Sequence, residues 1–151
     1  MITAQVETLA EVLEDLKPFF HGHWEELALN KDKVPLDPDY PQYLAREAAG
    51  GVVLVTLRSD GAIVGYFVGF VAPHIHYKSC LTCTMDIFYI QPEFRGRMGG
   101  VRLFKRVEQE LKRRGVQRAF FGSKLHKDSG RLFEALGYSA VETYYSKWLG
   151  D

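Results

Sequence analysis

The chain has 151 residues, 46% of them hydrophobic, with as many acidic as basic side chains. This length fits one domain with a full hydrophobic core, so we expect residues 1–151 to form a single domain. An apolar run long enough to span a membrane and a signal-peptide pattern after Met1 are both missing, which predicts a cytoplasmic protein with no membrane contact.

The first half predicts helices followed by a hairpin. Apolar residues recur at helical spacing behind a capping box at Thr8, and predict a helix that ends between Pro18 and Gly22. Short helices over 23–30 and 42–49 follow, and we expect the proline-rich loop between them to rim a substrate pocket. Residues 52–57 and 62–71, joined at Ser59-Asp60-Gly61, predict a β-hairpin.

The second half alternates strands and helices. Strands are predicted over 81–90 and 116–122, helices over 101–114 and 127–136, and a final strand or hairpin over 140–149. Gly115 and Gly137 are the predicted helix ends. This order indicates the α/β class, with a mixed sheet and helices on both of its faces.

The cysteines and histidines give no strong metal signal. Cys80 and Cys83 have C-x-x-C spacing, but they fall at a predicted strand, where positions three apart point to opposite faces. Structural thiols are therefore favoured over a redox or zinc pair. The His21/His23 and His74/His76 pairs are assigned to separate loops, so no metal site is predicted.

A glycine- and arginine-rich turn separates the strand over 81–90 from the helix that follows. Unpaired backbone N–H groups at the start of that helix would suit a pyrophosphate, because glycine lets the backbone approach closely and arginine adds positive charge. A basic turn on a solvated surface is the alternative. The residues of this predicted cradle are Arg95, Gly96, Arg97, Gly99 and Gly100.

Residues 92–104, Pro-Glu-Phe-Arg-Gly-Arg-Met-Gly-Gly-Val-Arg-Leu-Phe, resemble the acetyl-coenzyme A loop of the GNAT superfamily of N-acetyltransferases. Arg95 and Gly100 match the ends of that family's pattern. Met98 stands where the family has its first glycine, and we expect its backbone to avoid positive φ. Residues 129–138, Ser-Gly-Arg-Leu-Phe-Glu-Ala-Leu-Gly-Tyr, are similar to the family's helix that ends in a Leu-Gly-aromatic turn.

The resemblance implies an N-acetyltransferase that moves an acetyl group from acetyl-CoA to a primary amine of a small molecule or an exposed amino group. It also implies a central, mostly antiparallel sheet in which the strands at 81–90 and 116–122 splay apart. The pantetheine arm then inserts between these two strands, where backbone groups pair with it. The residues implied in coenzyme binding are Phe88, Tyr89, Ile90, Arg95, Gly96, Arg97, Met98, Gly99, Gly100, His126 and Arg131.

Asp86 is the candidate general base. It is the one acid in the strand over 81–90, and similar polyamine acetyltransferases place a strand acid at this position. A solvent-exposed or arginine-paired carboxylate is the alternative. The family often has a tyrosine acid where this chain has Phe133. One of Tyr138, Tyr144 and Tyr145 could reach the sulfur instead, and Tyr138 and Tyr145 become the candidate acids, with aromatic packing as their alternative role and solvent-assisted thiolate release as the alternative mechanism.

Charge is segregated along the chain. Residues 1–94 hold six Lys/Arg against thirteen Asp/Glu, whereas residues 95–131 hold twelve against three. One explanation of this division is a helix whose basic face is solvated. The other is a polyanionic cofactor that binds the basic segment, with a cationic acceptor attracted to the acidic segment. A nucleic-acid surface ranks lower, because it leaves the glycine loop unexplained.

A second hypothesis is a non-catalytic member of the same fold that binds an acyl-CoA or a partner protein. It rests on Met98 and Phe133, which replace two residues that the family pattern expects. The sequence does not specify the acceptor amine. It also leaves the oligomeric state open, a homodimer included.

Overall fold

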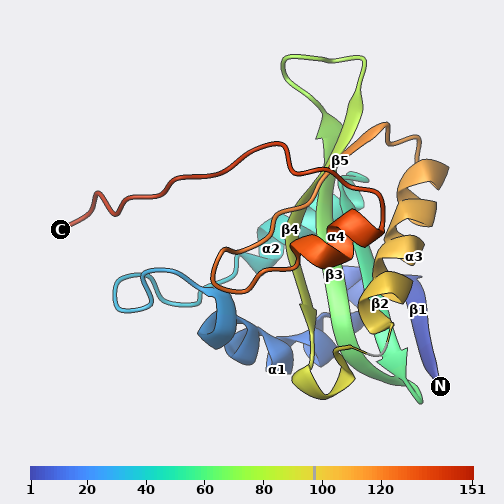
Figure 1. Cartoon of the computed structure of the whole chain (residues 1–151), viewed down its shortest axis with the longest axis horizontal. Coiled ribbons are helices and arrows are strands. Elements are labelled where there is room, and N and C mark those ends of the chain that lie inside the picture. The colour runs from blue at the N-terminus through green and yellow to red at the C-terminus, as the bar shows by residue number, and fades with distance from the viewer. Residues whose placement is uncertain (97) are drawn as a thin grey trace.

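The computed structural model describes residues 1–96 and 98–151, and a five-stranded sheet forms its centre (Figure 1). The strands lie in sequence order, the first four pair antiparallel, and the last pairs parallel to its neighbour. The predicted mixed, mostly antiparallel sheet is thus confirmed. The strands are β1 (Ile2–Glu7), β2 (Val52–Ser59), β3 (Ala62–Pro73), β4 (Leu81–Ile90) and β5 (Arg118–Phe120).

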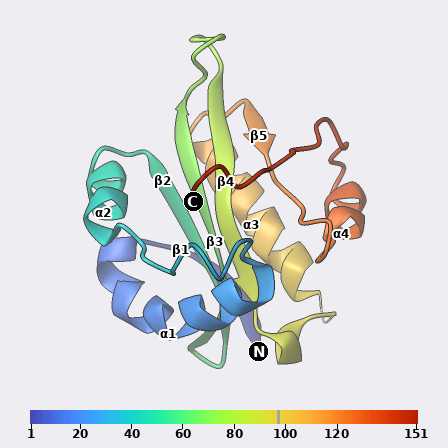
Figure 2. The same ribbon diagram turned by 90° about the vertical axis from the view of Figure 1, so that its left-hand side faces the viewer.

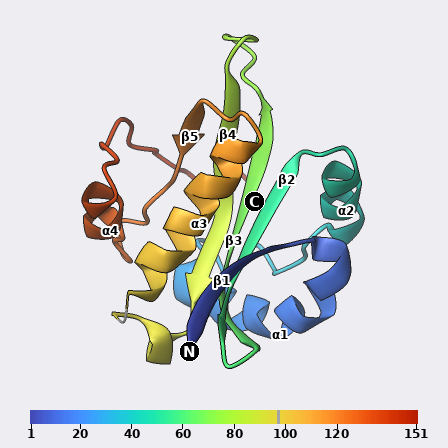
Figure 3. The same ribbon diagram turned by 90° about the vertical axis from the view of Figure 1, so that its right-hand side faces the viewer.

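Helices cover both faces of the sheet, as Figures 2 and 3 show from opposite sides. Helices α1 (Leu9–Leu27) and α2 (Tyr40–Ala48) lie on one face, and α3 (Gly99–Arg113) and α4 (Gly130–Ala135) lie on the other. Alternate residues of β2 serve the two layers, since Val53 and Val55 pack in the α3 core and Leu54 packs in the α1 core. A 3-10 turn, η1 (Pro92–Phe94), joins β4 to the start of α3. No helix of the described residues is long and apolar enough to cross a membrane.

Two expectations for the first half are wrong. Residues 2–7 form β1, an edge strand that the sequence pattern did not indicate. Helix α1 also continues through Pro18 to Leu27, and takes in most of the residues expected in a second helix. Pro18 removes one backbone hydrogen bond, but it lies on the exposed side of α1, whereas Leu16 and His23 keep the buried side continuous. Packing on the sheet therefore outweighs the local penalty.

The end of the chain also differs from expectation. The predicted strand or hairpin over 140–149 is not formed, and β5 has three residues in place of the expected 116–122. Residues 139–151, called the tail below, run extended and project away from the sheet (Figure 1). Lys33 Nζ lies 5.5 Å above the Trp148 ring of the tail. A cation–π contact of this kind contributes about 0.5–1 kcal/mol, whereas fixing the backbone of one residue costs about 1–2 kcal/mol. This contact alone therefore does not offset the entropy cost of ordering the tail.

A buried carboxylate ties α3 to the start of β2. Glu110 is 2% exposed and accepts hydrogen bonds from Arg113 and Arg114 at 2.7 and 2.8 Å. Arg114 also donates to the Val52 carbonyl at 2.8 Å. The hydrogen bond from Arg113, followed by that from Arg114, lowers the pKa of Glu110 to about 2 against the opposing effect of burial.

We expect Glu110→Gln to lower the free energy of unfolding at pH 7 by roughly 2 kcal/mol, because charge-assisted hydrogen bonds are lost. The lowered pKa stabilises the folded state above the unfolded value of 4.5, and this stabilisation is lost as the pH falls toward about 2. The difference between variant and wild type should shrink over that range. Urea unfolding at several pH values measures it, with the exposed Glu134→Gln as control. An equal difference at every pH would contradict the assignment.

Candidate active site

The site lies where β4 and β5 separate. These strands pair only from Thr82–Arg118 to Thr84–Phe120, although β4 continues to Ile90. Residues 85–90, called the splayed edge below, pair with β3 on one side and with no described strand on the other. A cavity of about 2200 Å³ opens beside them. It exceeds the roughly 300–1,000 Å³ of ordinary small-ligand pockets, so it has room for a long ligand together with an acceptor.

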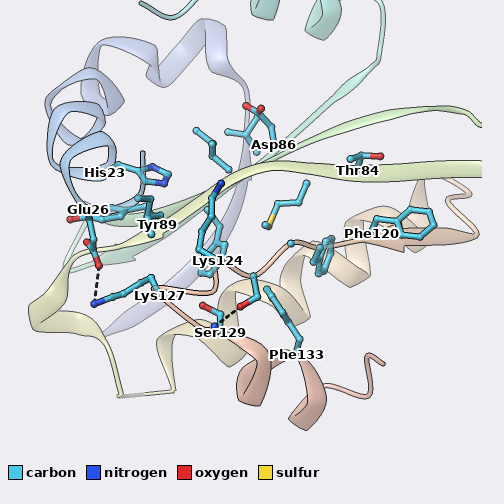
Figure 4. Close-up of a pocket in the computed structure, with 18 of the residues that line it drawn as sticks. His23, Glu26, Thr84, Asp86, Tyr89, Phe120, Lys124, Lys127, Ser129 and Phe133 are labelled. Atoms are coloured by element: carbon cyan, nitrogen blue, oxygen red, sulfur yellow. Dashed lines mark hydrogen bonds and ion pairs between the residues drawn. The ribbon is translucent and has the colours of Figure 1, made fainter. Parts of the chain in front are cut away.

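Asp86 occupies an irregularity of β4 at the start of this cavity. Val68 pairs with Ile87 while Gly69 pairs with Met85, so Asp86 is the extra residue of a β-bulge. A bulge redirects the side chain of the extra residue, and Asp86 is half-buried among the residues that line the cavity (Figure 4). Asp86 is therefore neither an exposed carboxylate nor, among the described residues, part of an ion pair with an arginine.

The hydroxyl of Tyr43 donates a hydrogen bond to Asp86 Oδ2. Burial raises the pKa of the Asp86 carboxyl, and the hydrogen bond from Tyr43 and the charge of Arg46 act in the opposite direction. Burial and the neighbouring carboxylate in turn raise the pKa of Tyr43, so this phenol keeps its proton.

Tyr43 is not among the residues that the sequence indicated, although the helix that carries it was predicted. Asp39 caps α2 by accepting from the Gln42 backbone N–H at 3.0 Å. Tyr43 and Arg46 are three residues apart in this helix and share one face. Helical spacing could have paired these two residues, but it could not have shown that they face Asp86.

A second polar group ties α1 to the turn after β4. Arg95 donates to both carboxylate oxygens of Glu26 at 2.7 Å, and its Nε donates to the Ile90 carbonyl at 2.7 Å. Lys127 Nζ lies 3.2 Å from Glu26 (Figure 4). The hydrogen bond from Arg95 lowers the pKa of Glu26, and the same bond raises the pKa of Arg95. Arg95, predicted as a phosphate contact, is thus engaged within the protein.

His23 lies on the α1 wall of the cavity, not in the loop that the sequence indicated. It is 8% exposed, its Nδ1 is 2.7 Å from the Tyr66 hydroxyl, and its ring stacks 5.0 Å from that of Tyr89. Burial lowers the pKa of His23 to about 4, so the imidazole is neutral at pH 7. The described residues contain no group of three or more His, Cys, Asp or Glu that could hold a metal ion.

The predicted coenzyme loop forms a turn that leads into α3. Gly96 has φ 73°, and Met98, the residue before the first of α3, has φ 60°. The expectation that Met98 avoids positive φ is therefore wrong. A Cβ on Gly100 would lie 2.9 Å from Leu132 Cδ2, so this glycine also lets α3 approach α4. The prediction for Arg97 lies outside the described residues.

The other predicted coenzyme residues take different positions. Phe88 and Ile90 pack in the α3 core, and Tyr89 packs in the α1 core, while the backbone of all three belongs to the splayed edge. His126 is exposed and lines the cavity. Arg131 is exposed in α4 and is not among the lining residues.

The two candidate acids, Tyr138 and Tyr145, lie in different environments. Tyr138 lines the cavity, half-buried, with its ring 4.9 Å from Phe121. Burial, then a hydrogen bond to Glu108, raises the pKa of Tyr138, so it is protonated at neutral pH. Tyr145 is 94% exposed in the tail and does not line the cavity. Phe133 is 6% exposed and also lines the cavity (Figure 4), but its ring has no proton to donate.

Both cysteines are free thiols, as expected. Cys83 is buried in the core of the sheet, and burial raises its pKa to about 12. A thiol with so high a pKa is a poor nucleophile and a poor metal ligand at pH 7, which agrees with the predicted structural role.

The sequence pattern of the acetyltransferase (GNAT) family matches residues 9–138. The chain belongs to this family. The match includes the splayed edge, the turn after β4 and helices α3 and α4. This match confirms the family that residues 92–104 and 129–138 indicated. Comparison with curated proteins gives no significant match.

Solved structures share the GNAT fold at low sequence identity. Ribosomal-protein-alanine N-acetyltransferase from Brucella melitensis biovar Abortus 2308 is 15% identical, with 99% of this chain and 100% of that chain covered and a TM-score of 0.73. Glucosamine-6-phosphate N-acetyltransferase from Arabidopsis thaliana is 10% identical, with 99% of each chain covered and a TM-score of 0.72. AAC(6')-Iy in complex with the bisubstrate analogue CoA-S-monomethyl-acetylneamine is 18% identical, with 98% and 99% covered and a TM-score of 0.64.

The left-handed backbone of Met98 gives a direct test of the loop. Positive φ costs a residue with a Cβ about 1–2 kcal/mol, so Met98→Gly should make the protein roughly 0.5–1 kcal/mol more stable than Met98→Ala, which keeps the strain. Coenzyme A binding should stay unchanged or become tighter. Thermal unfolding and isothermal titration measure the two effects. Weaker binding in Met98→Gly alone would show that the loop needs the strained conformation.

Proposed function

We propose that this GNAT protein transfers the acetyl group of acetyl-CoA to a primary amine, either of a small molecule or of an exposed amino group, in the cytoplasm. The observation that carries the proposal is the bulged, half-buried Asp86 at the start of the splayed edge. An acid positioned beside an unpaired strand edge suits a reaction in which an extended ligand pairs with the strand while an amine loses a proton.

The residues around the cavity fit acetyl-CoA. The backbone of the splayed edge can pair with the amide groups of a pantetheine arm, since no described strand takes those positions. The start of α3, which has no side-chain cap, offers free N–H groups to a pyrophosphate beside Gly100, which lines the cavity, whereas Gly99 is buried. Acetyl-CoA supplies an activated thioester. A bisubstrate analogue that contains CoA occupies the similar AAC(6')-Iy structure.

Asp86 would act on the acceptor. Alkyl amines are protonated at pH 7 and must lose a proton before they can attack a thioester. Burial raises the pKa of Asp86, which makes its carboxylate a better base than an exposed aspartate. Tyr43 limits this rise and orients the carboxylate through its hydrogen bond. Proton removal would take place at Asp86, directly or through one water.

Tyr138 would act on the leaving thiolate. It lines the cavity beside Phe121, the residue after β5, and it keeps its proton at neutral pH. Tyr145, the other candidate acid, would require a different position of the tail. Tyr138 is therefore the acid that we favour for this chain in the arrangement seen here.

A cationic acceptor fits the charges in the cavity. Asp37, in the proline-rich loop between α1 and α2, and Asp86, in β4, both line it. Carboxylates attract a protonated amine before it reaches the base. The names of the similar Brucella and Arabidopsis structures specify N-acetylation, which supports an amine as the acceptor class.

We expect Asp86→Asn to lower turnover about 10²- to 10⁴-fold, the usual effect of removing a general base, while coenzyme A binding persists. Release of the coenzyme thiol, measured with a panel of polyamines, lysine-like amines and amino sugars, gives the rate. Thr84→Ser, a conservative change on the same strand, is the control. Wild-type turnover in Asp86→Asn would remove Asp86 from the mechanism.

The same panel tests the alternative function. Coenzyme A binding by calorimetry without thiol release for any amine would favour a non-catalytic acyl-CoA-binding protein. If changes in the loop altered neither coenzyme A binding nor thiol release, both the catalytic and the non-catalytic hypothesis would be contradicted.

Tyr43→Phe should shift the acid limb of kcat/KM to higher pH. Without the donated hydrogen bond the charged form of Asp86 is less stable, so the pKa of Asp86 rises further and the base becomes active only at higher pH. The pH profile measures the shift. Tyr40→Phe is the matched control, because Tyr40 also lines the cavity and its hydroxyl has no hydrogen-bond partner among the described residues. An unshifted profile would mean that Tyr43 only packs.

A further inference from the structure

The imidazole of His23 is held in one tautomer by a buried tyrosine. Tyr66 is 0% exposed, and its hydroxyl has a single hydrogen-bond partner among the described residues, His23 Nδ1 at 2.7 Å. The phenol donates this bond, because the opposite arrangement would leave its proton without an acceptor in the core. Nδ1 is therefore the acceptor, and the proton of the neutral imidazole lies on Nε2.

The Nε2–H group of His23 faces the cavity without a partner of its own. No described residue donates to or accepts from this atom, yet the described residues contain no enclosed side-chain nitrogen or oxygen that lacks a hydrogen bond. The small exposed part of the ring thus includes Nε2, which lines the cavity (Figure 4). Stacking on Tyr89 fixes the ring plane. The result is a directed donor in a buried wall, as a bound acceptor oxygen requires.

Lys124 brings a positive charge to the same part of the cavity. Its ammonium group forms no ion pair within the described chain, whereas Arg95 and Lys127 are paired with Glu26. Figure 4 shows the Lys124 side chain extending from the loop after β5 toward the wall that carries His23. After burial, and against the charge of Glu26, the charge of Lys124 helps to lower the pKa of His23, which places the two groups near each other.

We infer that His23 and Lys124 form an anion subsite for the acceptor, so that the acceptor carries a carboxylate or phosphate in addition to its amine. An N–H donor beside an ammonium group suits anionic oxygens. The inference rests on the proposed function and specifies the acceptor of that reaction. Asp86, the candidate base, would take the amine end, and the subsite would take the opposite end.

The spacing of the two ends limits the length of the acceptor. Asp86 contacts Tyr43 of α2 and Tyr89 contacts His23 of α1, so both strand residues face the layer formed by α1 and α2. They are three residues apart on β4, which corresponds to roughly 10 Å along a strand. The amine and the anionic group should be separated by a comparable distance. A polyamine of this length would instead place a second ammonium group against Lys124.

The phosphates of the coenzyme are the other possible source of an anion. Their expected site is the start of α3, and α3 covers the face of the sheet opposite to α1 (Figures 2 and 3). His23 belongs to the α1 face, which also carries the contact between Tyr43 and Asp86. The position of the donor therefore assigns the anion to the acceptor.

Three amines of equal length test the subsite: aminohexanoate, hexylamine and diaminohexane. Each is titrated into ¹⁵N-histidine-labelled protein saturated with coenzyme A, and the chemical shift of His23 Nε2 gives the dissociation constant. We expect aminohexanoate to bind roughly tenfold more tightly than hexylamine, because it adds a charge-assisted hydrogen bond, and diaminohexane to bind no better than hexylamine. The same spectra should show Nε2 protonated and Nδ1 unprotonated.

Lys124→Gln should abolish the preference for aminohexanoate and leave coenzyme A binding unchanged. Lys112→Gln is the matched control, since Lys112 is exposed on α3 and does not line the cavity. The double variant His23→Phe/Tyr66→Phe, followed by calorimetry, should also abolish the preference. It keeps an aromatic ring beside Tyr89 and leaves no hydroxyl unpaired in the core.

Four results would overturn the subsite: equal or absent binding of aminohexanoate and hexylamine, a preference that survives Lys124→Gln, the opposite tautomer of His23, or a Lys124→Gln variant that loses coenzyme A binding and keeps the preference. The last result would assign the anion to the coenzyme. Thiol release is measured separately on the wild type. Selective binding of aminohexanoate without thiol release from any amine would support the subsite and contradict the proposed transfer reaction.

Discussion

The early end of strand pairing between β4 and β5 is the constraint on which the rest of the site depends. Because pairing stops at Thr84 and Phe120, the second half of β4 keeps one edge of backbone donors and acceptors free. Side chains of this edge pack in the α3 and α1 cores, which holds the edge in place although its other side pairs with no described strand. The bulge at Asp86 lies at the start of this free edge, and the cavity and the candidate base therefore have one structural origin.

Much of the sheet and of the loop could be predicted from the sequence, because their signals are local. The run from Leu81 to Ile90 gave the bounds of β4, and Pro92 with the glycines after it indicated where the chain turns into α3. Asp86 could be selected as a base because an acid in an apolar strand is unusual. Tyr43 could not, because its contact with Asp86 joins segments 43 residues apart and depends on how α2 packs.

The remaining errors also arise from tertiary contacts. Pro18 normally ends a helix, but the buried residues on both sides of it keep α1 on the sheet. The backbone of Met98 adopts a conformation that favours glycine, since the turn after Gly96 has to direct α3 across the sheet. The tail has strand composition, yet composition does not specify a partner, and no described strand pairs with it.

The ion pair between Glu26 and Arg95 links the packing of α1 to the charge that meets the loop. Arg95 donates to both Glu26 oxygens and to the Ile90 carbonyl, so a phosphate that takes the two N–H groups facing Glu26 would displace that carboxylate. Glu26 would then keep Lys127, whose Nζ lies 3.2 Å away, as its partner. Because Glu26 belongs to α1 and Arg95 follows η1, such a displacement would break the contact that holds these two segments together.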